Sequence, residues 1–100
     1  MPSKSKRKGN TYENELKAEL EKEGFKVDRA WGSDGRSLGL SEDVDLVANK
    51  GNKKYLIQAK RRKSIPKWLQ FGNCNLVMTR EDRGETIVLI KLKDFINETR

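Results

Sequence analysis

Residues 43–60 read DVDLVANKGNKKYLIQAK, and this stretch predicts two β-strands joined by a polar turn around Gly51. Side chains alternate between the two faces of a strand, so Gln58 and Lys60 are expected to point the same way. Neighbouring strands lie ~5 Å apart, which lets Asp45 of the first strand approach that pair. A carboxylate, an amide oxygen and an ammonium that converge on one spot suit a hard divalent cation, a water molecule and a phosphate.

The composition indicates one small domain without disulfides. The chain has 100 residues, 34% of them hydrophobic, and no apolar run is long enough to cross a membrane. With one cysteine, Cys74, and no histidine, a disulfide framework, a structural zinc site and a thiol–imidazole catalytic pair are excluded. No apolar segment follows the basic N-terminus, so we expect no signal peptide and an intracellular location: cytoplasm or nucleoid, or the host cytoplasm for a viral protein.

The charge distribution favours a nucleic-acid partner. The formal net charge is +7 and the pI is about 9.7. Basic residues are concentrated in two segments, one at the N-terminus and one in and after the second strand of the hairpin. They are Lys4, Lys6, Arg7 and Lys8 in the first segment, and Lys53, Lys54, Lys60, Arg61, Arg62 and Lys63 in the second. Residues 1–9 are expected to form a flexible basic arm that orders on DNA, or a solvated tail with no role, and residues 10–100 a single domain. Basic segments around an acidic centre fit a metal-dependent phosphodiesterase.

The segment before the central stretch predicts an amphipathic helix. Asn10 followed by Glu13 resembles a capping box, and Gly24 is expected to end the helix. The apolar stripe recurs every fourth residue, at Tyr12, Leu16 and Leu20. Glu13 lies on one edge of this stripe and Glu19 on the other, so the helical pattern alone does not choose between them.

The other expected elements give the order α-β-β-β-α-β-β-α. They are a strand at residues 25–30, a glycine-rich loop at 31–40, a short helix from Pro66, strands at 74–79 and 86–90, and a closing helix around 92–96. Trp68, Leu69 and Phe71 form an apolar cluster. This cluster is expected either to complete a small core or to form a dimer face.

Five short motifs in matching order and spacing resemble the archaeal-type Holliday junction resolvases. They are Arg7-Lys8-Gly9 before Glu13, Gly24-Phe25, Arg29-Ala30-x-Gly32-Ser33, Val44-Asp45-Leu46-Val47-Ala48 and Gln58-x-Lys60. The resemblance covers residues 7–63 and is to a PD-(D/E)xK nuclease. It implies an α/β, restriction-endonuclease-like fold, with a mixed central β-sheet flanked by helices. The chain looks like a compact version, such as a viral one.

The resemblance also implies an activity and its residues. The implied activity is resolution of four-way DNA junctions by a homodimer that makes paired symmetric nicks, with Mg²⁺ as cofactor and Mn²⁺ able to substitute. The implied catalytic residues are Glu13, Ser33, Asp45, Gln58 and Lys60. The implied metal ligands are Glu13, Asp45, Gln58 and the carbonyl of Ala59. The expected DNA contacts, from the resemblance and the charge pattern, are Arg7, Lys8, Arg29, Arg36, Arg61, Arg62 and Lys63.

Gln58 departs from the family pattern, which usually has glutamate at this position. A neutral amide still ligates magnesium through oxygen, but with less charge to hold the ion, and Asp43 is a candidate to supply that charge. Three alternatives stay open: a related nuclease that acts on flap or duplex DNA, an inactive module that binds branched DNA because of Gln58, and a small RNA-binding protein, which the basic charge alone permits.

Overall fold

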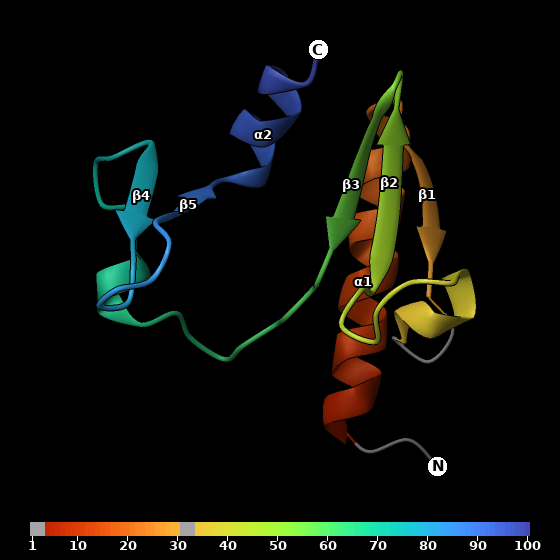
Figure 1. The fold of residues 1–100 in the computed structure, drawn as a ribbon, viewed down its shortest axis with the longest axis horizontal. Coiled ribbons are helices and arrows are strands. Elements are labelled where there is room, and N and C mark those ends of the chain that lie inside the picture. Colours follow the sequence, from red (N-terminus) through yellow and green to blue (C-terminus); the bar gives the residue numbers. More distant parts are fainter. Residues whose placement is uncertain (1–3, 31–33) are drawn as a thin grey trace. The chain divides into compact units, whose positions relative to one another are not determined.

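The computed structural model describes residues 4–30 and 34–100 (Figure 1). The chain divides into two compact units, the first ending at Arg61 and the second beginning at Arg62, and each is described by itself. The element order is a long helix, three strands, a short connecting segment, two strands and a closing helix. The α/β class agrees with the sequence prediction, and the order agrees except at the connecting segment, where a helix from Pro66 was expected.

The first unit opens with helix α1, which spans Lys4–Lys22. The helix begins before Asn10, so the expected capping box at Asn10 is wrong, and residues 4–9 are helical rather than a flexible arm. Gly24 ends the helix as predicted, with a positive φ of 96° that an L side chain rarely adopts. The backbone N–H of Phe25 donates to the carbonyl of Leu20 over 3.0 Å, which makes a Schellman-type end.

Three strands follow and form one antiparallel sheet in the order β1-β2-β3. They are β1 (Lys26–Arg29), β2 (Leu46–Lys50) and β3 (Lys53–Ile57). The predicted hairpin is therefore present, with its turn at Gly51, where φ is 61°. Both hairpin strands are shorter than expected, because Asp45 precedes β2 and Gln58 follows β3.

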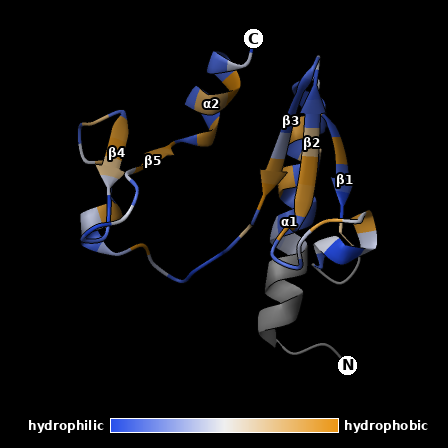
Figure 2. Ribbon diagram, in the orientation of Figure 1, coloured by the Kyte–Doolittle hydropathy of each residue, from blue (hydrophilic) through white to orange (hydrophobic). Residues whose placement is uncertain are grey.

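One face of this sheet packs on α1 and forms the core of the first unit. Leu46 and Ala48 of β2 lie opposite Arg29 and Val27 of β1, so all four side chains share this face. Leu46 is completely buried, as is nearly all of Leu20 in α1. Figure 2 shows the apolar part of β2 beside α1 and a hydrophilic hairpin end. The stripe predicted on the helix thus packs against the strand predicted as central.

The loop between β1 and β2 contains a short 3₁₀ helix, η2 (Gly35–Leu38), within the predicted glycine-rich segment. Asp34 caps it by accepting a hydrogen bond from the backbone N–H of Arg36 over 3.0 Å. Gly35 is buried, and a Cβ at this position would overlap the carbonyl oxygen of Ser41 and the side chain of Val44. Only glycine therefore lets this loop pack against the residues that lead into β2.

The second unit contains η3 (Lys67–Leu69), β4 (Leu76–Thr79), β5 (Ile87–Ile90) and α2 (Leu92–Glu98). β4 and β5 pair as an antiparallel hairpin, and the expected helix at Pro66 is only a short 3₁₀ turn. Trp68 is 66% exposed, so this side chain is not part of the core of the second unit. Within the described ranges, no helix has the length and apolar character to cross a membrane.

Candidate active site

Asp45 lies at the end of the sheet, where the ladder continues for one residue beyond the strands. Its backbone N–H donates to the carbonyl of Ile57 over 2.8 Å, and its carbonyl accepts from the N–H of Ala30 over 2.8 Å. These two bonds fix the backbone of Asp45 between β1 and β3. The residue is only 7% exposed, although it carries a carboxylate. A buried acid at a strand end is unusual enough to require a partner.

The backbone of Ala59 supplies that partner. Its N–H donates to Oδ2 of Asp45 over 2.7 Å, which holds the segment after β3 against the carboxylate. Gln58 and Lys60 flank Ala59 on this segment, and both are exposed. The structure therefore brings the second half of the predicted motif beside Asp45, as the sequence predicts. It does so through a backbone hydrogen bond rather than through continuous strand pairing.

The electrostatics of Asp45 show that further charges lie near. Burial raises the pKa of Asp45, and the hydrogen bond from Ala59 opposes this effect. The negative charges of Glu13 and Asp43 also raise the pKa of Asp45, while the positive charge of Lys60 lowers it. Glu13, predicted from the first helix, thus acts on the same site as Asp45. The surplus of negative charge makes the site favourable for a cation.

Glu13 is the second buried acid, with 3% exposure, whereas Glu19 on the other edge of the helical stripe is exposed. Arg29 of β1 donates a hydrogen bond from Nε to Oε2 of Glu13 over 3.1 Å. The Arg29 side chain is 28% exposed and also donates from Nη1 to Oδ1 of Asn14 over 3.4 Å. The guanidinium predicted to contact DNA therefore also fixes the buried acid.

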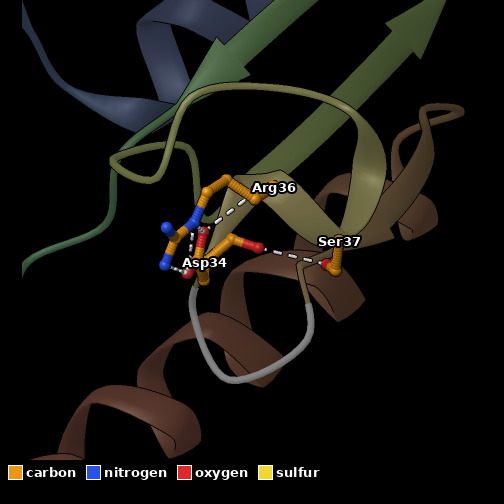
Figure 3. Close-up of polar contacts among 3 residues, drawn as sticks. All are labelled: Asp34, Arg36 and Ser37. Atoms are coloured by element: carbon orange, nitrogen blue, oxygen red, sulfur yellow. Dashed lines mark hydrogen bonds and ion pairs between the residues drawn. The ribbon is translucent and has the colours of Figure 1, made fainter.

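Arg36 forms a local ion pair in the loop before β2. Its Nη2 lies 2.6 Å from Oδ2 of Asp34, and its Nε donates to both carboxylate oxygens over 3.0 Å (Figure 3). This pairing lowers the pKa of Asp34 and raises the pKa of Arg36, chiefly through the side-chain hydrogen bond. Ser37 donates to the carbonyl of Asp34 over 3.1 Å. The guanidinium stays 70% exposed, so its predicted DNA contact stays a prediction.

The remaining predicted site residues fall in three groups. Arg7 and Lys8 lie in α1. Arg61, Arg62 and Lys63 are exposed in the segment that follows Lys60. Ser33, the predicted catalytic hydroxyl, lies outside the described residues. Glu13, Asp45, Ala59 and the flanking Gln58 and Lys60 are thus the predicted residues that the structure gathers at one end of the sheet.

A comparison with protein-family models decides the relationship. Residues 4–98 match the model described as archaeal Holliday junction resolvase (hjc). The chain belongs to the archaeal Holliday junction resolvase family. The match extends the resemblance from residues 7–63 to nearly the whole sequence. No match was found among curated proteins, and none among solved structures.

Membership of the resolvase family makes the chain a nuclease of DNA recombination and repair that acts on branched DNA. Two helices combined with antiparallel sheets agree with the nuclease fold of this family. The predicted family and fold class are thereby confirmed. The single domain expected at residues 10–100 stays a prediction. The family match covers residues 4–98 and so includes residues of both units.

The predicted donors at the candidate site are of the type that binds magnesium. In the part of the chain that the structure describes, no three His, Cys, Asp or Glu side chains gather as a metal site. The predicted donors are the carboxylates of Glu13 and Asp45, the amide of Gln58 and the carbonyl of Ala59. Magnesium keeps several waters and binds through one or two carboxylates, so this all-oxygen set fits it. The surplus negative charge around Asp45 is a second reason for the fit.

Two features of the resolvase site were missed by sequence reasoning. Asn14 contacts Arg29 next to Glu13, and the sequence offers no signal for it, because an exposed helical asparagine is common. Gly35 fixes the loop beside Val44, and its signal was a glycine inside a segment already rich in glycine. Both depend on contacts between segments that lie apart in the sequence.

Proposed function

We propose that this chain is a magnesium-dependent endonuclease that resolves four-way DNA junctions as a homodimer, by paired symmetric nicks. The observation that carries the proposal is a pair of buried acids, Glu13 and Asp45, close enough for the charge of Glu13 to raise the pKa of Asp45, in a chain of the resolvase family. Burying two carboxylates near each other costs stability, and such an arrangement is typical of a functional site.

Glu13, Asp45, Gln58 and the carbonyl of Ala59 would hold the ion, with Glu13 binding directly or through water. When bound, magnesium supplies polarisation of a phosphoryl oxygen and a water of lowered pKa. The N–H of Ala59 keeps the Asp45 carboxylate in one orientation. Arg29 does the same for Glu13. The positions of both acids are thus fixed before substrate binds, which reduces reorganisation during the reaction.

Lys60 is proposed to act on the reacting phosphate. Its ammonium is close enough to Asp45 to lower the pKa of that acid, so it lies near the site. There it would orient the attacking water and stabilise the charge that develops on the phosphate. Water adds its oxygen to phosphorus while the bond from phosphorus to one ester oxygen breaks, which leaves a phosphate end and a hydroxyl end. Ser33 is proposed to assist, as the family resemblance implies.

The symmetry of the substrate supports the dimer. A four-way junction has two-fold symmetry, and a symmetric dimer presents two sites to two opposing strands. The exposed Trp68 is proposed as part of the dimer face. A mixed dimer of wild type and Lys60→Gln chains tests this point on a labelled junction. We expect one nick per junction from mixed dimers and two from wild type; unchanged paired nicking would contradict the dimer.

A second candidate function rests on Gln58. A neutral amide holds a divalent cation less strongly than glutamate, so the chain could bind junctions without cleaving them. Junction incubation with Mg²⁺, with Mn²⁺ and with EDTA separates the two functions. Nicking in Mg²⁺ that stops in EDTA supports the nuclease, and tight binding without nicks in either metal supports the binding module.

A further inference from the structure

The hairpin end of the first unit carries a row of polar side chains on the face opposite α1. The strand register places Lys26 of β1 beside Asn49 of β2, and Asn49 beside Lys54 of β3. Directly opposite residues in paired strands share a face, so these three side chains line up across the sheet. We call them the Lys26–Asn49–Lys54 row.

The direction of this row follows from its neighbours. Arg29 reaches Glu13 of α1, and Lys50 donates from Nζ to the carbonyl of Glu23 at the end of α1 over 3.2 Å. These residues define the α1 face of β1 and β2. Lys26 and Asn49 lie an odd number of positions from them along the same strands, so they point away from the helix.

The row is exposed and positively charged. Lys26 and Lys54 are exposed and Asn49 is partly exposed. The nearest acid on the same face is Asp28, which lies beside Val47 in the next row of the sheet. Strand spacing places the backbones of Lys26 and Lys54 ~10 Å apart, with an amide between them. Two ammoniums flanking an amide are suited to phosphate oxygens.

The same strand leads to the candidate active site. Asp45 precedes Asn49 by four residues, and its backbone continues the ladder on both sides. It lies one residue before β2, at the end of that strand opposite to the row. Four residues of strand span ~13 Å, which matches about four base-pair steps along a DNA duplex.

We propose that the Lys26–Asn49–Lys54 row binds the phosphate backbone of a junction arm, about four base-pair steps from the cut. The row contributes affinity and orientation, not chemistry, because it lies far from Asp45. Phosphate contacts fix the register of a protein on DNA without reading sequence. This inference rests on the proposed junction binding and names a surface for it.

Salt-dependent binding tests the row on the full-length protein. The double variant Lys26→Gln/Lys54→Gln keeps the stems and removes two charges. The matched control, Lys67→Gln/Lys93→Gln, removes two charges from exposed lysines of the second unit. Affinity for an immobile four-way junction is measured in EDTA over a range of salt concentrations, with circular dichroism melting to verify folding.

We expect the slope of log affinity against log salt to fall by about 1.8 in the row variant, with a clearly smaller change in the control. An unchanged slope in the row variant, or an equal change in both variants, would overturn the inference.

Neutral linkages in the DNA provide a second arm of the test. Methylphosphonates are placed in a short window that is moved along each junction arm. Where the window covers the contacted phosphates, wild type and row variant should bind equally well. A difference that persists at every window position contradicts a phosphate contact.

If wild type does not bind junctions at all, the proposed function fails; if wild type binds and cuts while the row has no effect, only this inference fails.

Discussion

Arg29 and Glu13 form an ion pair between β1 and α1, with Nε 3.1 Å from Oε2 and only 3% of the Glu13 side chain exposed. The pair joins the helix to the sheet at the end of the first unit that carries the candidate active site. It also compensates a charge that burial would otherwise make costly. One contact therefore serves both the stability of the fold and the geometry of the candidate site.

Replacing Arg29 with Gln should destabilise the protein by about 1–3 kcal/mol, because it leaves the buried Glu13 carboxylate without its charged partner. The double variant Glu13→Gln/Arg29→Gln should recover much of this loss, since no charge then remains unpaired. Urea denaturation of wild type, both single variants and the double variant measures the coupling. A double variant less stable than Arg29→Gln alone would contradict the pairing.

Asp45→Asn should raise the stability of the metal-free protein while it removes cleavage. Burial and the nearby acids raise the pKa of Asp45 above its ordinary value, so the ionised form is disfavoured in the folded state. The resulting cost appears as the pH rises above about 4 and is fully present once Asp45 is ionised. Asparagine carries no charge and avoids it.

Thermal melting in EDTA at neutral pH measures this effect. Each ~1 kcal/mol gained should raise Tm by about 4–8 °C in a domain of this size. At a pH below 4 the advantage of Asp45→Asn should shrink, because the wild-type carboxyl is then protonated in both states. A neutral-pH Tm equal to or below that of wild type would show that Asp45 is not under electrostatic strain.

Gly35→Ala should be strongly destabilising, because the added methyl group overlaps the carbonyl of Ser41 and the side chain of Val44. Overpacking of this kind costs about 1–3 kcal/mol. The control is Gly39→Asn in the same loop, where φ is 75° and nothing lies within 4 Å of the added Cβ. Asparagine tolerates this backbone conformation, so the control should change stability much less. Equal losses by chemical denaturation would contradict the packing described for Gly35.

Gln58→Glu should lower the magnesium concentration needed for cleavage, because a second charged ligand would strengthen the hold on the ion. Asp43→Asn should raise that concentration if Asp43 supplies the missing charge, as its effect on Asp45 suggests. Both variants are compared in magnesium titrations of junction cleavage, alongside direct Mn²⁺ binding. An unchanged magnesium requirement for Asp43→Asn would exclude its role, and a raised requirement for Gln58→Glu would exclude Gln58 as a ligand.

The central hairpin was predictable because it depends on local pattern. The polar turn around Gly51 between two apolar segments sets the register that places Leu46 opposite Ile57. Asp45 precedes Leu46 and Gln58 follows Ile57, so the same register brings these two segments to one end of the sheet. The helical stripe ending at Leu20 was predictable for the same reason, because a period near 3.6 specifies the buried side. These elements required no knowledge of distant contacts.

Other features depend on tertiary contacts or on competing local signals. Asn10 resembles a helix start, but the lysines and arginine before it are good helix formers, and α1 begins at Lys4. The pairing of Arg29 with Glu13 joins residues 16 positions apart, and nothing in the local pattern specifies it. The Lys26–Asn49–Lys54 row depends on the register of three paired strands.

The most direct test of the proposed function is cleavage of a labelled immobile four-way junction and of linear duplex of the same sequence, in magnesium, by wild type and Asp45→Asn. We predict paired symmetric nicks in the junction alone, absent in Asp45→Asn although that variant stays folded and binds the junction. Cutting of both substrates would contradict junction selectivity, and cleavage that survives in Asp45→Asn would contradict the site itself.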